Sequence, residues 1–139
     1  PSFFVWTSRD PNAGWLQRAQ IIKGWVEDGQ SREKIYDVAC SDGLSPDPKT
    51  HRCPNNEAKV NLSNCSVTSD RGNVMLKAVW RDPDFSPQEH AYYYVRVLEN
   101  PSCRWSTWDA IRLGIEPNPD LAATHQERAW SSPIWYEPN

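Results

Sequence analysis

Apolar and polar side chains alternate along much of this chain with a period of two residues, which is typical of half-buried β-strands. In the segment 73–82, one face is formed by Val74, Leu76, Ala78 and Trp80. Lys77 and Arg81 lie on the opposite face. This pattern predicts a strand with one side in the core and the other side toward water.

Five further segments are rich in β-branched and aromatic residues and also read as strands. They are 3–8, 16–27, 32–39, 91–100 and 127–137. Turn residues separate them, such as Asp28-Gly29, a strong hairpin signal. The pattern predicts an all-β, immunoglobulin-like antiparallel sandwich of about six or seven strands.

A polar excursion interrupts these strands between residues 41 and 73. It is rich in Pro, Asn, Ser and Asp, and its one weak strand signal is at 58–63. We interpret it as a long irregular loop of the same domain, so that residues 1–139 form a single domain.

A short helix is predicted after residue 105. Ser106 is a suitable N-cap, and Gly114 is suited to end the helix. Trp105, Trp108 and Ile111 recur at intervals of three and would share one face of the helix.

The tyrosines at 92–94 raise the question of whether the aromatic residues form a core or a binding surface. Tyr93 alternates in phase with Val95 and Val97, which places it in the core, whereas Tyr92 and Tyr94 fall on the other face. We expect the helix to pack over that second face, and most aromatic rings to lie inside. A platform for a flat ligand and a partner surface remain the alternatives. The candidate aromatic residues for those roles are Tyr92, Tyr94, Trp105, Trp108, Trp130 and Trp135.

Composition narrows the function classes. The net charge is −3, with 15 basic and 18 acidic residues and no basic block, so the chain lacks the charge pattern of a nucleic-acid binder. No apolar run approaches the length of a membrane span. The chain opens without Met in a segment that reads as a strand, and we therefore expect it to be part of a longer protein.

The four cysteines contain no C-x-x-C pair, which disfavours a zinc site. We predict two disulfides, Cys40–Cys53 and Cys65–Cys103, and hence an oxidising compartment. Other pairings and free buried thiols remain alternatives at this level.

No catalytic or metal-binding motif stands out. The three histidines lie far apart in sequence and none forms a ligand pair, so we expect surface histidines. Asp82 and Asp84 lie in the turn "RDPDF" without a calcium-loop pattern, and we expect solvated carboxylates there. We predict no catalytic residue, no metal ligand and no cofactor in this chain.

Three strings carry a family resemblance: "LQRAQIIKGWVEDGQSREKIYDVA", "WRDPDFSPQEHAYYYVRVLENPSCRWSTWDAIRLG" and "QERAWSSPIWYEP". In this order they resemble the C-terminal portion of a bacterial domain-of-unknown-function family that is similar to CehA/McbA-like metallohydrolases of the PHP superfamily. The likeness extends over 3–138 and is weakest across 41–73.

The resemblance implies a metal-binding barrel upstream and a terminal β-sandwich that closes with Ser132-Pro133-Ile134-Trp135-Tyr136. The barrel's His and Asp ligands have no counterpart here, so any divalent metal and any hydrolase activity belong to the upstream part. We therefore expect a non-catalytic accessory domain of a larger periplasmic or extracellular bacterial protein. Its expected partner is the upstream metallohydrolase-like domain, with homo-oligomerisation as a further role. The alternative is a module that binds carbohydrate or another ligand.

Overall fold

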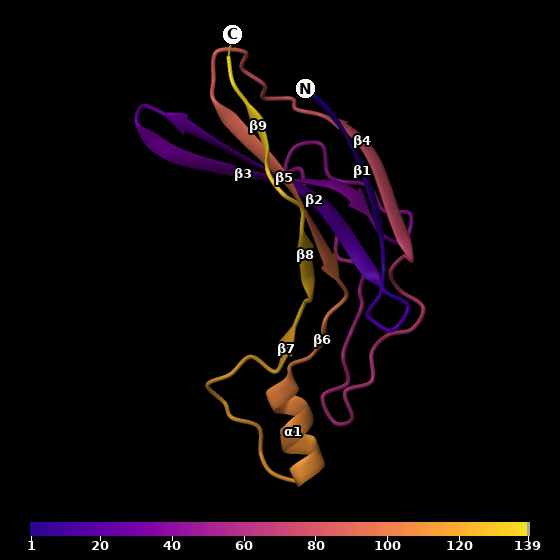
Figure 1. Cartoon of the computed structure of the whole chain (residues 1–139). Coiled ribbons are helices and arrows are strands. Elements are labelled where there is room, and N and C mark those ends of the chain that lie inside the picture. The colour runs from indigo at the N-terminus through magenta and orange to yellow at the C-terminus, as the bar shows by residue number, and fades with distance from the viewer. Residues whose placement is uncertain (139) are drawn as a thin grey trace.

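The computed structural model describes residues 1–138 and shows a chain built mostly of antiparallel strands (Figure 1). The elements in chain order are β1 (Ser2–Ser8), β2 (Leu16–Glu27), β3 (Gln30–Cys40), β4 (Met75–Arg81), β5 (Ala91–Glu99), β6 (Ser102–Cys103), α1 (Trp105–Leu113), β7 (Thr124–His125), β8 (Arg128–Trp130) and β9 (Ile134–Tyr136). The predicted all-β class is confirmed, and the predicted last strand is divided into β8 and β9.

The strands form two main layers. One layer is a five-stranded sheet in the order β3-β2-β5-β8, in which β9 also pairs with β5. The other layer is the antiparallel pair β1–β4. The core cluster between them is mostly aliphatic, with Val5, Leu16, Ile21 and Leu76 each no more than 4% exposed. The arrangement is consistent with a sandwich in which the smaller layer covers one face of the larger one.

The turn sequence Asp28-Gly29 determines how β2 and β3 pair. These two residues have φ values of 51° and 73°. A two-residue hairpin with both central residues at positive φ matches the twist of the strands that it joins. The predicted turn is confirmed, and β2 has the predicted bounds.

The phenol rings of two tyrosines are buried in the core as expected. Tyr36 and Tyr93 are each 1% exposed. Phe3 lies 4.8 Å from Tyr93 and Trp80 lies 4.9 Å from Tyr36, measured between ring centroids. These contacts join both layers through one aromatic group, which supplies much of the packing at this end of the core.

The expectation that most tryptophans fill the core is wrong. None of the eight indoles in residues 1–138 is buried. Five are exposed, namely Trp6, Trp105, Trp108, Trp130 and Trp135. The reason is geometric: a two-stranded layer encloses little volume, and aliphatic side chains and two tyrosines already occupy it. Val74, which was expected on the core face, lies outside β4 and is 54% exposed.

The turn after β4 also differs from its expected character. Asp82 is 4% exposed and accepts a hydrogen bond of 2.7 Å from the Tyr93 hydroxyl. The neighbouring Asp84 accepts one from the Tyr36 hydroxyl. A buried phenol needs a partner for its O–H group, and these carboxylates provide it. Asp82 is therefore a core residue, although the sequence pattern favoured a solvated turn.

Helix α1 ends as predicted but begins differently. Gly114 takes the left-handed conformation that closes the helix. The N-cap is Arg104, which makes no side-chain capping bond, so Ser106 is not the cap. Figure 1 shows α1 beyond β6 and β7, away from the faces of both sheets. The predicted packing of α1 over the tyrosines is wrong. In the described part of the chain, no helix has the length and apolarity that crossing a membrane requires.

The excursion 41–73 is irregular, as predicted, and the expected strand at 58–63 is reduced to a single bridge between Val60 and Val67. The disulfides Cys40–Cys53 and Cys65–Cys103 are both present, which confirms the predicted pairing. In the chain-entropy account they stabilise the fold by about 3 and about 4 kcal/mol. The second one links the excursion to β6, just before α1.

Asp42 joins the two ends of this excursion through hydrogen bonds. Its carboxylate accepts hydrogen bonds from the Gly72 amide at 2.9 and 3.0 Å, from the Ser41 hydroxyl and from the Asn56 amide. Burial alone would raise the pKa of Asp42, but the bonds from Ser41, Gly72 and Asn56 outweigh it and lower the pKa. The carboxylate form thus stabilises the loop closure.

We predict that this contribution depends on pH with a defined sign. Because the pKa of Asp42 is lower in the folded state, its stabilisation is present above the unfolded value near 3.8 and is lost as pH falls through the folded value. At pH 7, Asp42→Asn should lower the free energy of unfolding by about 1–3 kcal/mol. Urea unfolding from pH 7 to pH 2.5 measures this. Asp70→Asn, at an exposed carboxylate, is the control, and a difference between Asp42→Asn and wild type that stays constant to pH 2.5 would contradict the assignment.

Candidate functional site

One face of the five-stranded sheet is turned away from β1 and β4, and an aromatic row crosses it. The register places Tyr92 of β5 opposite Gly24 of β2 on one side and opposite Trp135 of β9 on the other. Directly opposed residues share a sheet face. Tyr94, two residues along β5, lies on the same face. We call Tyr92, Tyr94 and Trp135 the aromatic face.

The rings of the aromatic face are close and partly parallel. The rings of Tyr92 and Tyr94 are nearly parallel, at 11° with centroids 6.3 Å apart, and the Trp135 ring centroid lies 5.4 Å from that of Tyr92. Trp135 is 70% exposed. Burial, followed by the charge of Glu33, raises the pKa of Tyr94, whereas Arg96 acts in the opposite direction. The Tyr94 hydroxyl, with its raised pKa, keeps its proton at neutral pH.

Gly24 is required beneath this row. A Cβ atom at this position would lie 2.1 Å from Cζ of Tyr92. Absence of a side chain thus lets the Tyr92 ring approach the backbone of β2. A pocket of about 300 Å³ opens at this end of the aromatic face, with Tyr92, Trp135, Arg32 and His90 among its lining residues.

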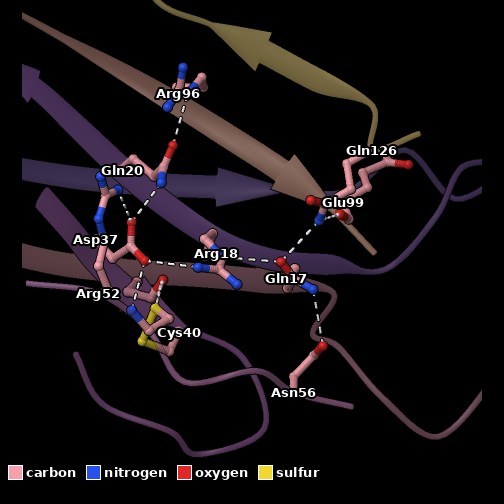
Figure 2. A network of polar contacts seen from close by, with 12 residues as sticks. Gln17, Arg18, Gln20, Asp37, Cys40, Arg52, Asn56, Arg96, Glu99 and Gln126 are labelled. Atoms are coloured by element: carbon pink, nitrogen blue, oxygen red, sulfur yellow. Dashed lines mark hydrogen bonds and ion pairs between the residues drawn. A yellow bond between two sulfur atoms is a disulfide. The ribbon is translucent and has the colours of Figure 1, made fainter. Parts of the chain in front are cut away.

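A polar network continues the same face toward the disulfide Cys40–Cys53, as Figure 2 shows. Its centre is the buried Asp37, which accepts hydrogen bonds from Arg18 at 3.0 Å and Gln20 at 2.6 Å. The backbone amide of Cys53 donates to the same carboxylate at 2.7 Å. Arg52 lies 3.5 Å away as an ion pair. Each Asp37 oxygen is engaged, so this carboxylate holds the excursion 41–73 against the sheet.

Buried amides extend the network at its other end. Gln17 donates to Asn56 at 3.1 Å and accepts a hydrogen bond from Gln126 at 2.9 Å. Gln126 also donates to the carbonyl oxygen of Glu99. These contacts join β2, the excursion and the segment after β7, and their geometry is that of structural links with satisfied partners.

Arg96 connects the polar network with the aromatic face. Its Nε donates to Gln20 at 2.7 Å, and it lies opposite Trp130 of β8 in the register. No carboxylate within residues 1–138 forms an ion pair with Arg96. With Arg18 and Arg52 sharing Asp37, this part of the face carries positive charge on a chain whose net charge is −3.

A second apolar surface lies on the smaller layer. On the outer face of β1–β4, Phe4 is 65% exposed, Trp6 61% and Val79 79%. Phe4 pairs with Val79 and Trp6 with Lys77 in the register, and the Lys77 ammonium lies 4.9 Å from the Trp6 ring centroid. We call Phe4, Trp6 and Val79 the outer patch.

The structure separates the six aromatic residues that the sequence singled out. Tyr92, Tyr94 and Trp135 come together, and Trp130 lies farther along the same face beside Arg96. Trp105 and Trp108 lie apart on α1, where they are 66% and 39% exposed. Sequence reasoning missed the outer patch. The unbroken apolar run from Phe3 to Trp6 was the signal, because a half-buried strand would alternate.

The positions of the His, Cys, Asp and Glu side chains show whether a metal ion could be held. Within residues 1–138, no group of three or more His, Cys, Asp or Glu side chains has the spacing to hold a metal ion. His51 packs 5.1 Å from the Tyr36 ring and His125 lies 2.9 Å from the Glu127 carboxylate, so each has a structural neighbour.

A family model described as a protein of unknown function, DUF3604, matches residues 1–138. The chain belongs to this family. No curated protein and no solved structure gives a significant match. Family membership confirms the predicted domain of unknown function, and the relation to CehA/McbA-like metallohydrolases stays a prediction.

We predict that Gly24→Ala disrupts the aromatic face, because the added Cβ displaces the Tyr92 ring. Overpacking of this kind costs about 1–3 kcal/mol of folding stability. Urea unfolding measures the loss. Gly29→Ala is a comparison variant, because an added Cβ at Gly29 meets no atom and only the positive φ opposes the substitution. In a Tyr92→Ala background the ring that would clash is gone. The double variant Gly24→Ala/Tyr92→Ala should therefore be almost as stable as Tyr92→Ala alone. Equal losses in both backgrounds would refute the clash.

Proposed function

We propose that this chain is a non-catalytic accessory domain of a larger exported protein, similar to PHP-type metallohydrolases, and that its outer patch packs against the upstream domain. The observation that carries the proposal is the exposure of Phe4, Trp6 and Val79 on two paired strands. The divalent metal and the catalytic residues of such a protein would belong to the upstream domain.

Strand β1 supports this proposal through its composition. Phe3 and Val5 face the core, while Phe4 and Trp6 face outward, so the strand is apolar on both sides. Strands with this pattern are ordinarily covered on both faces. Contiguous exposed apolar residues on a folded domain commonly mark an interaction surface.

The upstream domain is the occupant that fits this surface best. In the proposed protein the upstream domain precedes β1, the strand whose outer face carries Phe4 and Trp6. Lys77 and Arg81 flank the patch on the outer side of β4. The partner surface should therefore be apolar at its centre and acidic at its rim.

The two disulfides support a location outside the cytoplasm, because such bonds persist in oxidising compartments. In the proposed assignment this location is the periplasm or the extracellular space. A domain that docks onto an exported enzyme would gain from being cross-linked, since it is exposed to proteases there.

We predict that Trp6→Ser separates the two domains of the longer protein. A protease site inserted before Pro1 allows the chain to be cut, and size-exclusion chromatography then shows whether the halves remain together. Loss of a buried tryptophan anchor costs about 2 kcal/mol or more, which weakens association about 30-fold. Trp105→Ser removes an equally exposed indole from α1 and is the matched control.

Wild-type halves that separate after cleavage would contradict the proposed docking, as would Trp6→Ser halves that associate as tightly as wild type. The isolated chain provides one more outcome. If it dimerises and Trp6→Ser abolishes the dimer, a second copy covers the patch, and the proposed occupant is wrong. Unchanged urea unfolding of the isolated Trp6→Ser chain shows that the fold is intact.

The aromatic face favours a second function, binding of a carbohydrate. Sugar rings stack on exposed aromatic rings, and Arg96 beside Tyr94 could pair with a carboxylate or sulfate substituent. We predict that, if this function holds, an acidic oligosaccharide quenches tryptophan fluorescence in wild type and that Trp135→Ala lowers the affinity at least about tenfold, a loss of about 1.4 kcal/mol. Trp105→Ala is the control. No response of wild type to any polysaccharide on a glycan array would exclude this function.

A further inference from the structure

A lysine and two carboxylates meet inside the sandwich, apart from both surfaces described above. The Lys23 side chain on β2 is 2% exposed. Its ammonium nitrogen lies 2.9 Å from Oδ2 of Asp82 and 3.3 Å from Oε2 of Glu89. It also donates a hydrogen bond of 2.8 Å to the carbonyl oxygen of Asp84. A lysine buried to this degree is rare unless it is paired.

The Asp82 carboxyl group is held in one orientation by two further donors. Oδ1 accepts a hydrogen bond of 2.9 Å from the backbone amide of Asp84. Oδ2 accepts one of 2.7 Å from the Tyr93 hydroxyl. The side chain of Asp82 is fully buried. The carboxyl carbon therefore lies one bond beyond an oxygen that already contacts Lys23, between donors that can stabilise charge on either oxygen.

Burial sets a cost on a permanent charge pair at this site. The Trp25 ring centroid lies 5.2 Å from the Lys23 nitrogen, a cation–π contact that offsets part of this cost for the ammonium, and the Tyr93 ring packs against Phe3 and Trp80. Removing an ammonium and a carboxylate from water costs several kcal/mol per ion, which their attraction only partly offsets. Burial, followed by the hydrogen bond to Asp82, raises the pKa of Tyr93, so its hydroxyl remains a proton donor. Conversion of the ion pair to a neutral amide would remove the cost of burying both charges.

We propose that Lys23 and Asp82 join in an intramolecular isopeptide bond, with Glu89 as the group that relays the proton. This inference is independent of the proposed function. It rests on the three side chains, their burial and the donors around Asp82.

The reaction balances as a condensation. Glu89 accepts a proton from the Lys23 ammonium and relays it to Oδ2 of Asp82, and the freed electron pair of the nitrogen attacks Cγ of the neutral carboxyl group, forming the C–N bond. The amide of Asp84 stabilises the negative charge that develops on Oδ1. The bond from Cγ to Oδ2 then breaks, and Oδ2 leaves as water with two protons that come from the lysine nitrogen, one of them carried by Glu89. Nothing is oxidised or reduced, and no co-reactant is needed.

The bond would tie the two layers together covalently. Lys23 lies in β2 of the five-stranded sheet, and Asp82 directly follows β4 of the smaller layer. The disulfides join the excursion 41–73 to β3 and to β6 instead. The three cross-links would thus restrain different parts of the chain.

Intact mass spectrometry of the folded wild-type chain tests the proposal. The expected mass is that of the sequence with two disulfides, less one water molecule, and peptide mapping should show the Lys23 and Asp82 peptides joined. Asp82→Asn should reach the same product mass by losing ammonia in place of water. Lys23→Met should lose neither.

Glu89→Gln separates the chemistry from the fold. It keeps the size of the side chain but removes the proton acceptor, and the bond should form about 100-fold or more slowly. Lys34→Met is the matched control: Lys34 pairs with Asp84, but both side chains are more than 40% exposed, so the wild-type loss of water should persist.

Three results would overturn the proposal. The first is a wild-type mass without loss of water after prolonged incubation of the folded chain, which would leave Lys23–Asp82 as an ion pair only. The second is a cross-link mapped to other residues. The third is an unchanged rate in folded Glu89→Gln. Because the wild-type mass and map need no variant, the proposal stays testable even if Lys23→Met fails to fold.

Discussion

A two-stranded layer covers one face of a five-stranded sheet, and most features of this molecule follow from that imbalance of area. The enclosed volume is small, so the core takes Val5, Ile21 and Leu76 and only two fully buried phenol rings. The remaining large aromatic side chains lie on outward faces. Exposed indoles here are a consequence of the architecture, and they become available for contacts with another surface.

The same imbalance explains where polar groups are buried. The open face of the five-stranded sheet needs some cover, and the excursion 41–73 supplies it through Asp37, which receives hydrogen bonds from Arg18, Gln20 and the Cys53 amide. The disulfide Cys40–Cys53 holds the loop in position for that contact. On the covered side, phenol hydroxyls require partners, and this requirement places Asp82 in the core beside Lys23.

The outer patch and the aromatic face have different chemical character. The outer patch is apolar with a basic margin, which suits a protein partner with a complementary surface. The aromatic face combines nearly parallel rings with Arg96, whose Nε donates to Gln20, and this combination suits a flat, acidic ligand. Both surfaces are carried by one chain of the DUF3604 family, and within residues 1–138 neither contains a set of metal ligands.

Local patterns in the sequence determined the elements that depend on neighbours along the chain. The alternation in β4 and β5, the Asp28-Gly29 turn and the Gly114 helix end all follow from backbone and side-chain preferences within a few residues. The sequence favoured one pairing of the four cysteines but left the others open, and the structure decided between them. Membership of an all-β class could therefore be predicted from these elements alone.

Only the tertiary structure decided which apolar faces are covered. An apolar side of a strand or helix looks the same in sequence whether another layer packs on it or not, so Trp105 and Trp108 were expected over the sheet and Phe4 and Trp6 were not noticed. The burial of Asp82 was equally hidden, because its partners Lys23 and Tyr93 come from other strands. Solvent exposure is set by the area that one layer offers another, and no local pattern records that area.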